Sequence, residues 1–143
     1  MLKGLLDLHN LLRWAIFILL LLNIIKNYAN INKPFTAGDK KSGLWLLICS
    51  HLTLVAGIAL LVIDLVHLPS GTPVMQNAAL RRQYVEHPVA MLIAIVFITT
   101  GYGTRKKNIT DAAKHKRSAT LYLIAFIIIL AMIPWDKALI PGM

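Results

Sequence analysis

Four histidines are the residues of this 143-residue chain whose type and spacing could do chemistry together. Each belongs to one of four apolar segments, at alternating ends: His9, His51, His87 and His115. In an up-down-up-down bundle this alternation brings His9 and His87 to one end and His51 and His115 to the other. Imidazole is a common ligand of metals and of haem iron. The pattern therefore predicts two pairs of axial ligands.

Ligation of haem by two histidines needs imidazoles on facing helices, at the same depth in the bundle. His9 with His87 meets this requirement, and His51 with His115 meets it approximately. Arginines that suit haem propionates lie close by in sequence: Arg13, Arg81 and Arg82. Arg13 follows His9 by four residues and so shares its helix face. We expect one or two haem b groups that pass electrons within or across a membrane.

Two other interpretations of the same residues stay open. One is a non-haem metal site of mixed nitrogen and oxygen ligands at one face, which would use His9, Asp64, His67, Glu86 and His87. No metal-binding spacing such as H-E-x-x-H supports that site. The other is a haem-free accessory or assembly subunit of a larger membrane complex, in which the polar groups serve assembly.

The elements that must position these histidines are membrane-spanning helices. The chain is 57% hydrophobic with a mean hydropathy of +0.67, which is typical of an integral membrane protein of one domain, residues 1–143. Four stretches approach the roughly 20 apolar residues that cross a bilayer: Leu11–Ile25, Leu44–Ile63, Val89–Tyr102 and Ala119–Ile133. The third is short unless its helix extends upstream from Val89 to Ala78, in which case Pro88 marks a kink.

The connections between these stretches are short, which favours antiparallel neighbours. The first loop is marked by turn-forming residues: Asn30, Asn32, Pro34, Gly38 and Gly43. This places His51 one to two turns inside the second helix. Thr110 and Asp111 form a suitable N-cap for a fourth helix of about 24 residues that ends near Pro134. The predicted fold class is an all-α antiparallel four-helix transmembrane bundle.

The net charge of +9 is distributed unevenly. Ten Lys and Arg residues lie in or beside the first and third loops, and five lie toward the opposite face. This is the bias of cytoplasmic loops, so both termini are expected on the non-cytoplasmic side. The basic loops should meet anionic lipid headgroups, and no role with nucleic acid is expected. The single cysteine, Cys49, excludes disulfides and cysteine-based metal sites within one chain.

Several motifs resemble a family of small bacterial four-helix membrane proteins that is often labelled cytochrome b-like. They are Leu8-His9-Asn10-Leu11-Leu12-Arg13-Trp14, Glu86-His87-Pro88, Lys114-His115-Lys116-Arg117 and Ile133-Pro134-Trp135, and the likeness covers nearly the whole chain. The ligand scheme is also similar to that of di-haem transmembrane b-type cytochromes.

This resemblance implies haem binding by His9, His87, His51 and His115, and residence in the bacterial inner membrane as a multi-pass protein. A quinol or a redox protein would be the electron partner, and the chain could work as a homo-oligomer or in a larger complex. Were the protein an enzyme, it would be a transmembrane electron-transfer oxidoreductase.

Overall fold

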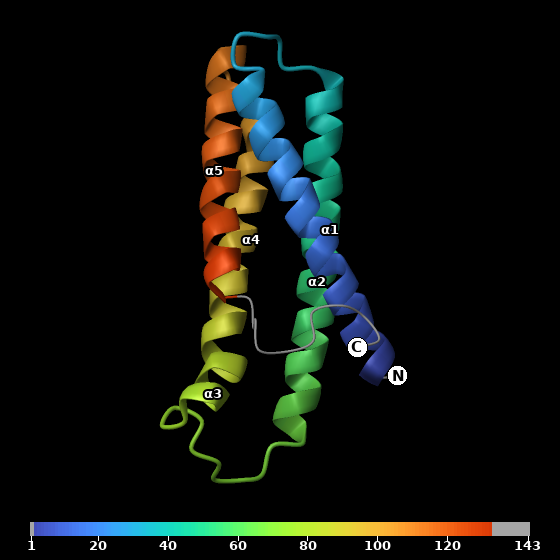
Figure 1. Ribbon diagram of the computed structural model, residues 1–143, viewed down its shortest axis with the longest axis vertical. Helices are drawn as coiled ribbons and strands as arrows, with labels where there is room; N and C mark the ends of the chain where they lie inside the picture. Colours follow the sequence, from blue (N-terminus) through green and yellow to red (C-terminus); the bar gives the residue numbers. More distant parts are fainter. Residues whose placement is uncertain (1, 133–143) are drawn as a thin grey trace.

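A computed structural model describes residues 2–132, which form four long helical segments placed side by side (Figure 1). The elements are α1 (Leu2–Ala29), α2 (Ala37–Val66), α3 (Ala78–Arg81), the π-helical turn η1 (Arg82–Glu86), α4 (His87–Gly103), the 3-10 turn η2 (Thr104–Lys106) and α5 (Asp111–Met132). The described part of the chain contains no strand. The all-α prediction is confirmed.

Four stretches are long and apolar enough to cross a membrane: Lys3–Ala29, Ala37–Val66, Ala78–Lys106 and Asp111–Met132. The shortest has 22 residues, against the roughly 20 that a hydrocarbon core requires. The protein is therefore a multi-pass membrane protein by the length and composition of its helices.

The four spans form a closed ring of neighbours. α1 packs on α2, α2 on α4, α4 on α5, and α5 returns to α1. Sequential spans are thus antiparallel neighbours, as expected, while α1 faces α4 and α2 faces α5 across the bundle. His9 and His87 belong to one diagonal pair of helices, and His51 and His115 to the other.

The apolar core extends from the end of the bundle that carries the connections 30–36 and 107–110, which we call the basic end, past the middle of the bundle. Its members are Ile16, Leu20, Ile24, Leu46, Ala94, Ile98, Tyr122, Ala125 and Ile129. None of them comes from the first two turns of α1 or α4. In Figure 1, α1 runs obliquely, so its N-terminal half diverges from α5. The packing is therefore looser at the end opposite the basic end.

The start of α2 differs from the expected position. Thr36 and Asp39 form a capping box: the Thr36 side chain accepts from the Asp39 backbone N–H at 3.4 Å, and the Asp39 carboxylate accepts from the Thr36 N–H at 2.8 Å. Gly38 and Gly43 therefore lie inside α2 and not in the first loop, so that prediction is wrong. As a result His51 lies about four turns from the start of α2, at 3.6 residues per turn, and not one to two.

The fourth span begins where the sequence predicts. Thr110 accepts from the Ala113 backbone N–H at 3.2 Å and caps α5, which starts at Asp111. His115 then lies about one turn inside the helix. The predicted end near Pro134 and the motif Ile133-Pro134-Trp135 lie outside the described residues.

The third span extends upstream through Ala78, as its short apolar run requires. Pro88 has no backbone N–H, and its ring would clash with the carbonyl four residues earlier in an α-helix. The chain resolves this with the π-helical turn η1, closed by the His87 N–H donating to the Arg82 carbonyl. The irregularity expected at Pro88 is thus a wide turn immediately before it.

Candidate functional site: a cavity shared by His9 and His87

A cavity of about 570 Å³ opens between the helices at the end opposite the basic end, which we call the cavity end (the lower end in Figure 1). Side chains from α1, α2, η1, α4 and α5 line it. Its volume lies in the range of ligand and cofactor sites, about 300 to 1,000 Å³. Most of its wall is apolar, and ten of its lining residues are polar or charged: Lys3, Asp7, His9, Asn10, Arg13, Ser50, Thr53, Asp64, Gln83 and His87.

His9 and His87 both line this cavity, from helices that face each other across the bundle. The pair predicted for this end is thus brought into one cavity.

The two imidazole rings are held differently. His87 Nδ1 lies 3.1 Å from the backbone carbonyl oxygen of Met132. Since a carbonyl only accepts, Nδ1 carries the proton and donates, which places the lone pair of the neutral ring on Nε2. A histidine that ligates a metal is commonly oriented in this way through its other nitrogen.

His9 is oriented by a close approach to α2. A Cβ built on Gly57 would lie only 3.3 Å from His9 Nε2, which is tighter than an ordinary contact. Glycine at position 57 therefore gives the imidazole room to lie against the backbone of α2.

Arg13 brings a partly unsatisfied cation to the cavity. Its Nη2 donates to Asn10 Oδ1 at 2.7 Å, whereas its Nη1 is buried without a hydrogen-bond partner among the described residues. A buried guanidinium nitrogen without a partner is energetically costly, and more so at membrane depth. The arrangement suits an anionic group of a ligand inside the cavity.

The other two arginines predicted to bind propionates do not line the cavity. Arg81 donates from Nε to Glu86 Oε2 at 2.9 Å and from Nη1 to the Met75 carbonyl at 3.0 Å. Arg82 is exposed on the η1 turn. Only Arg13 of the predicted three faces the cavity.

The structure does not bring His51 and His115 together. His51 is exposed, and its Nε2 lies 3.2 Å from Thr99 Oγ1 on α4. His115 is completely buried, and lies about three turns nearer the basic end, by their places in α2 and α5. The capping box of α2 is the physical reason, because it lengthens that helix before His51.

Both ring nitrogens of His115 have protein partners. Nδ1 lies 2.8 Å from Asn27 Oδ1, and Nε2 lies 3.3 Å from the Pro34 carbonyl oxygen. The ring also packs against Phe35, with ring centroids 5.1 Å apart. His115 thus joins α5 to α1 and to the first loop.

The contacts of His115 continue into a hydrogen-bonded network at the basic end. Asn27 donates to the Asn23 carbonyl at 2.7 Å, and Asn23 accepts from Ser42 Oγ at 2.8 Å. The sequence interpretation missed these asparagines. Their four-residue spacing in an apolar segment is the pattern that could have found them, since polar side chains join helices in membranes.

The mixed-ligand metal site is not assembled in this structure. Within residues 2–132, no three His, Cys, Asp or Glu side chains lie where they could hold a metal ion. His67 Nδ1 lies 2.8 Å from the Ile63 carbonyl of its own helix. Asp64 accepts from Gln83 at 3.3 Å, and Glu86 pairs with Arg81.

Comparison with known proteins adds no assignment: no family model, no curated protein and no solved structure matches this chain. The cavity, its two histidines and Arg13 are therefore the basis for a functional proposal.

Proposed function

We propose that the protein binds one haem b in the cavity, with His9 and His87 as axial ligands, and carries electrons in the membrane. The observation that supports this most directly is that both histidines line one cavity together with Arg13, whose Nη1 is buried and has no hydrogen-bond partner within residues 2–132. A bound haem would supply a one-electron carrier whose potential depends on its ligands and surroundings.

The residues present fit such a group in chemistry and in space. His9 and His87 line the cavity from two diagonal helices and would both be available to hold the iron, and the Met132 carbonyl already orients His87. Gly57 keeps the backbone of α2 close to His9 without a side chain in the way. Met91, Ile95 and Ile98 provide apolar wall.

Arg13 has a separate role in this proposal. Its buried Nη1 would donate to a propionate, and this bond would remove the energetic penalty of leaving that nitrogen without a partner. A cation near the iron also favours the reduced state over the oxidised state by simple electrostatics. The histidines serve as ligands and not as acid–base groups.

The proposal includes no second haem. Both ring nitrogens of His115 have partners within the protein, and His51 lies at another depth. A haem held by His9 and His87 would lie near one face of the membrane and would supply electron exchange at that face. The electron partner would then be a quinol or a redox protein that reaches the cavity end.

The first test is the spectrum of the protein purified in detergent after expression with surplus haem. We expect the reduced-minus-oxidised bands of a low-spin b-type cytochrome. His9→Ala and His87→Ala should each remove the haem, and the double change should cost no more than either single one. His67→Ala is the matched control, because His67 is bonded to its own helix, and it should keep full haem content.

A colourless protein under these conditions would overturn the proposal and leave the haem-free accessory subunit as the better account. Zinc in such a protein would favour the non-haem metal site instead. Equal haem loss from His51→Ala would mean that the assignment of ligands is wrong.

The same proposal includes an orientation, with the basic end cytoplasmic and the cavity end on the other side of a bacterial inner membrane. Single cysteines at Lys40, Thr72 and Lys107, in a Cys49→Ser background, test it by impermeant labelling of intact cells. Only the cysteine at position 72 should react. Labelling at positions 40 and 107 with protection at 72 would invert the model.

A further inference from the structure

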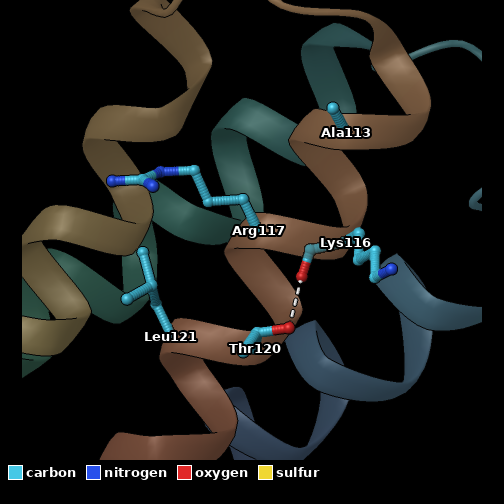
Figure 2. Close-up of a pocket in the computed structure, with 5 residues that line it drawn as sticks. All are labelled: Ala113, Lys116, Arg117, Thr120 and Leu121. Atoms are coloured by element: carbon cyan, nitrogen blue, oxygen red, sulfur yellow. Dashed lines mark hydrogen bonds between the residues drawn. The ribbon is translucent and has the colours of Figure 1, made fainter.

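A second, shallow hollow of about 350 Å³ lies on the surface of α5 near the basic end (Figure 2). It is lined by Ala113, Lys116, Arg117, Thr120 and Leu121. These positions follow a helical spacing of three and four residues, so they form one stripe of α5. Figure 2 shows the two cations extending away from each other, Arg117 toward the side of α4 and Lys116 toward the side of α1.

Some basic residues of the same end have partners within the protein. Lys26 pairs with Asp39 at 3.2 Å, and Arg105 lies 3.7 Å above the centre of the Tyr102 ring. Lys116 and Arg117 are exposed and have no side-chain partner within residues 2–132. Two adjacent positive charges thus flank the hollow without compensation from the described protein.

One edge of the hollow carries a fixed hydroxyl and an aromatic ring. Thr120 Oγ1 donates to the Lys116 carbonyl at 2.7 Å, as Figure 2 shows, and lies 3.1 Å from the hydroxyl of Tyr28 on α1. Tyr28 is exposed, and exposed tyrosines favour the boundary between headgroups and hydrocarbon.

The depth of the hollow matches a phospholipid. From Asp111, the two cations lie about 8 Å along the helix at 1.5 Å per residue, and Leu121 lies about 15 Å along it. Each headgroup layer is about 5 to 8 Å thick. A phospholipid whose phosphate lies at the level of the two cations would therefore extend an acyl chain along Thr120 and Leu121 into the hydrocarbon.

We propose that the hollow on α5 is a binding site for one anionic phospholipid, whose headgroup phosphate lies at the hollow and is attracted by the charges of Lys116 and Arg117 on its two sides. Charge complementarity and the apolar floor below the cations select a lipid over a soluble anion. The site is independent of the haem cavity, which lies at the other end of the bundle.

The test counts lipids bound to the full-length protein by native mass spectrometry from a non-ionic detergent. The probes are phosphatidylglycerol, phosphatidylcholine with the same acyl chains, and inorganic phosphate. We expect one high-affinity phosphatidylglycerol, weakened about 30-fold by the double change Lys116→Gln and Arg117→Gln, given the usual attraction of two cations to an anionic headgroup. The haem content of this variant should not change.

The matched control is Lys40→Gln with Lys41→Gln, which removes two exposed charges from the first turns of α2 at the same end. It should weaken binding less than about 2-fold, as expected for charges outside the site. Equal losses from both pairs would mean diffuse attraction and overturn the proposal. Equal binding of phosphatidylcholine, or competition by millimolar phosphate, would also overturn it.

A variant that keeps both charges provides a separate readout. Ala113→Leu fills part of the hollow from the exposed stripe of α5 and should lower phosphatidylglycerol affinity several-fold. Unchanged affinity in this variant would contradict a seated lipid, even where the charge variants behave as expected.

Discussion

Histidines have different surroundings at the two ends of the bundle. At the basic end His115 is buried, both of its nitrogens have partners, and those partners belong to a wider network. At the cavity end His9 and His87 line an open volume beside Arg13, whose Nη1 has no described partner.

This difference separates stabilisation from binding. A satisfied polar network fixes how helices meet, because each buried group has its hydrogen bond. An unsatisfied group beside a cavity lowers stability until a ligand completes it, which is typical of functional sites. The sequence predicted one histidine pair at each end, and the hydrogen bonds show that only the cavity end brings its pair together.

The largest expected effect is on folding at the basic end. His115→Leu leaves Asn27 Oδ1 and the Pro34 carbonyl without their partner, and each such buried acceptor costs about 1 to 3 kcal/mol. We expect the free energy of unfolding of the haem-free protein to fall by about 3 kcal/mol. Circular dichroism during titration with a denaturing detergent measures this. His9→Leu is the control. It should change the free energy of unfolding by less than about 1 kcal/mol, because the leucine would lie against the apolar wall of the cavity. Equal effects would erase the distinction between the ends.

The next effect is on haem content at the cavity end. Gly57→Leu places a side chain where even a Cβ would lie 3.3 Å from His9 Nε2. We expect haem affinity to fall by at least about tenfold, equivalent to about 1.4 kcal/mol. The absorbance of the haem band against titrated haem measures it. Gly4→Leu is the matched control, since its Cβ would meet nothing within 4 Å. Unchanged haem affinity in the Gly57 variant would mean that the haem does not lie on this side of α2.

An effect of at most the same size is expected on the redox potential. Arg13→Gln removes the cation that favours reduced iron, so the midpoint potential should fall by about 60 mV, which is about 1.4 kcal/mol for one electron. Redox titration of the purified protein measures the shift. Arg82→Gln is the control and should leave the potential unchanged, because Arg82 does not line the cavity. A rise in potential, or the same fall in both variants, would contradict the role assigned to Arg13.

The smallest effect concerns His51. Within residues 2–132 its side chain makes one hydrogen bond, to Thr99, and hydrogen bonds between membrane helices contribute about 0.6 kcal/mol on average. His51→Ala should therefore lower the free energy of unfolding by roughly that amount and leave haem content intact. A loss of haem would return His51 to the list of ligands.

Much of the fold follows from residue patterns that act locally. Apolar runs of the required length specify the spans, Thr110 caps α5, and the short loops make successive spans neighbours. The upstream extension of the third span was also predictable, because a run from Val89 alone is too short to cross a bilayer.

The pairing of His51 with His115 could not be judged from hydropathy. The depth of a residue depends on where its helix begins, and α2 begins at a capping box of polar residues that a search for apolar runs passes over. Asn27 was missed for a related reason: its importance comes from His115, which is 88 residues away in sequence. His9 and His87 lie at the same end because each is near the start of its apolar segment and the segments alternate in direction. The sequence could therefore predict that they share one end of the bundle.

The π-helical turn before Pro88 also makes the third span sensitive to length. A π turn holds one residue more than an α turn, and one residue corresponds to about 100° of rotation around a helix axis. Deletion of one residue from η1 would thus leave α4 and His87 in place while α3 turned by about a quarter of a circle. The contact of Gln83 with Asp64 at the rim of the cavity would be lost. Homologues that shorten this turn by one residue would therefore present a different cavity entrance without any change in their histidines.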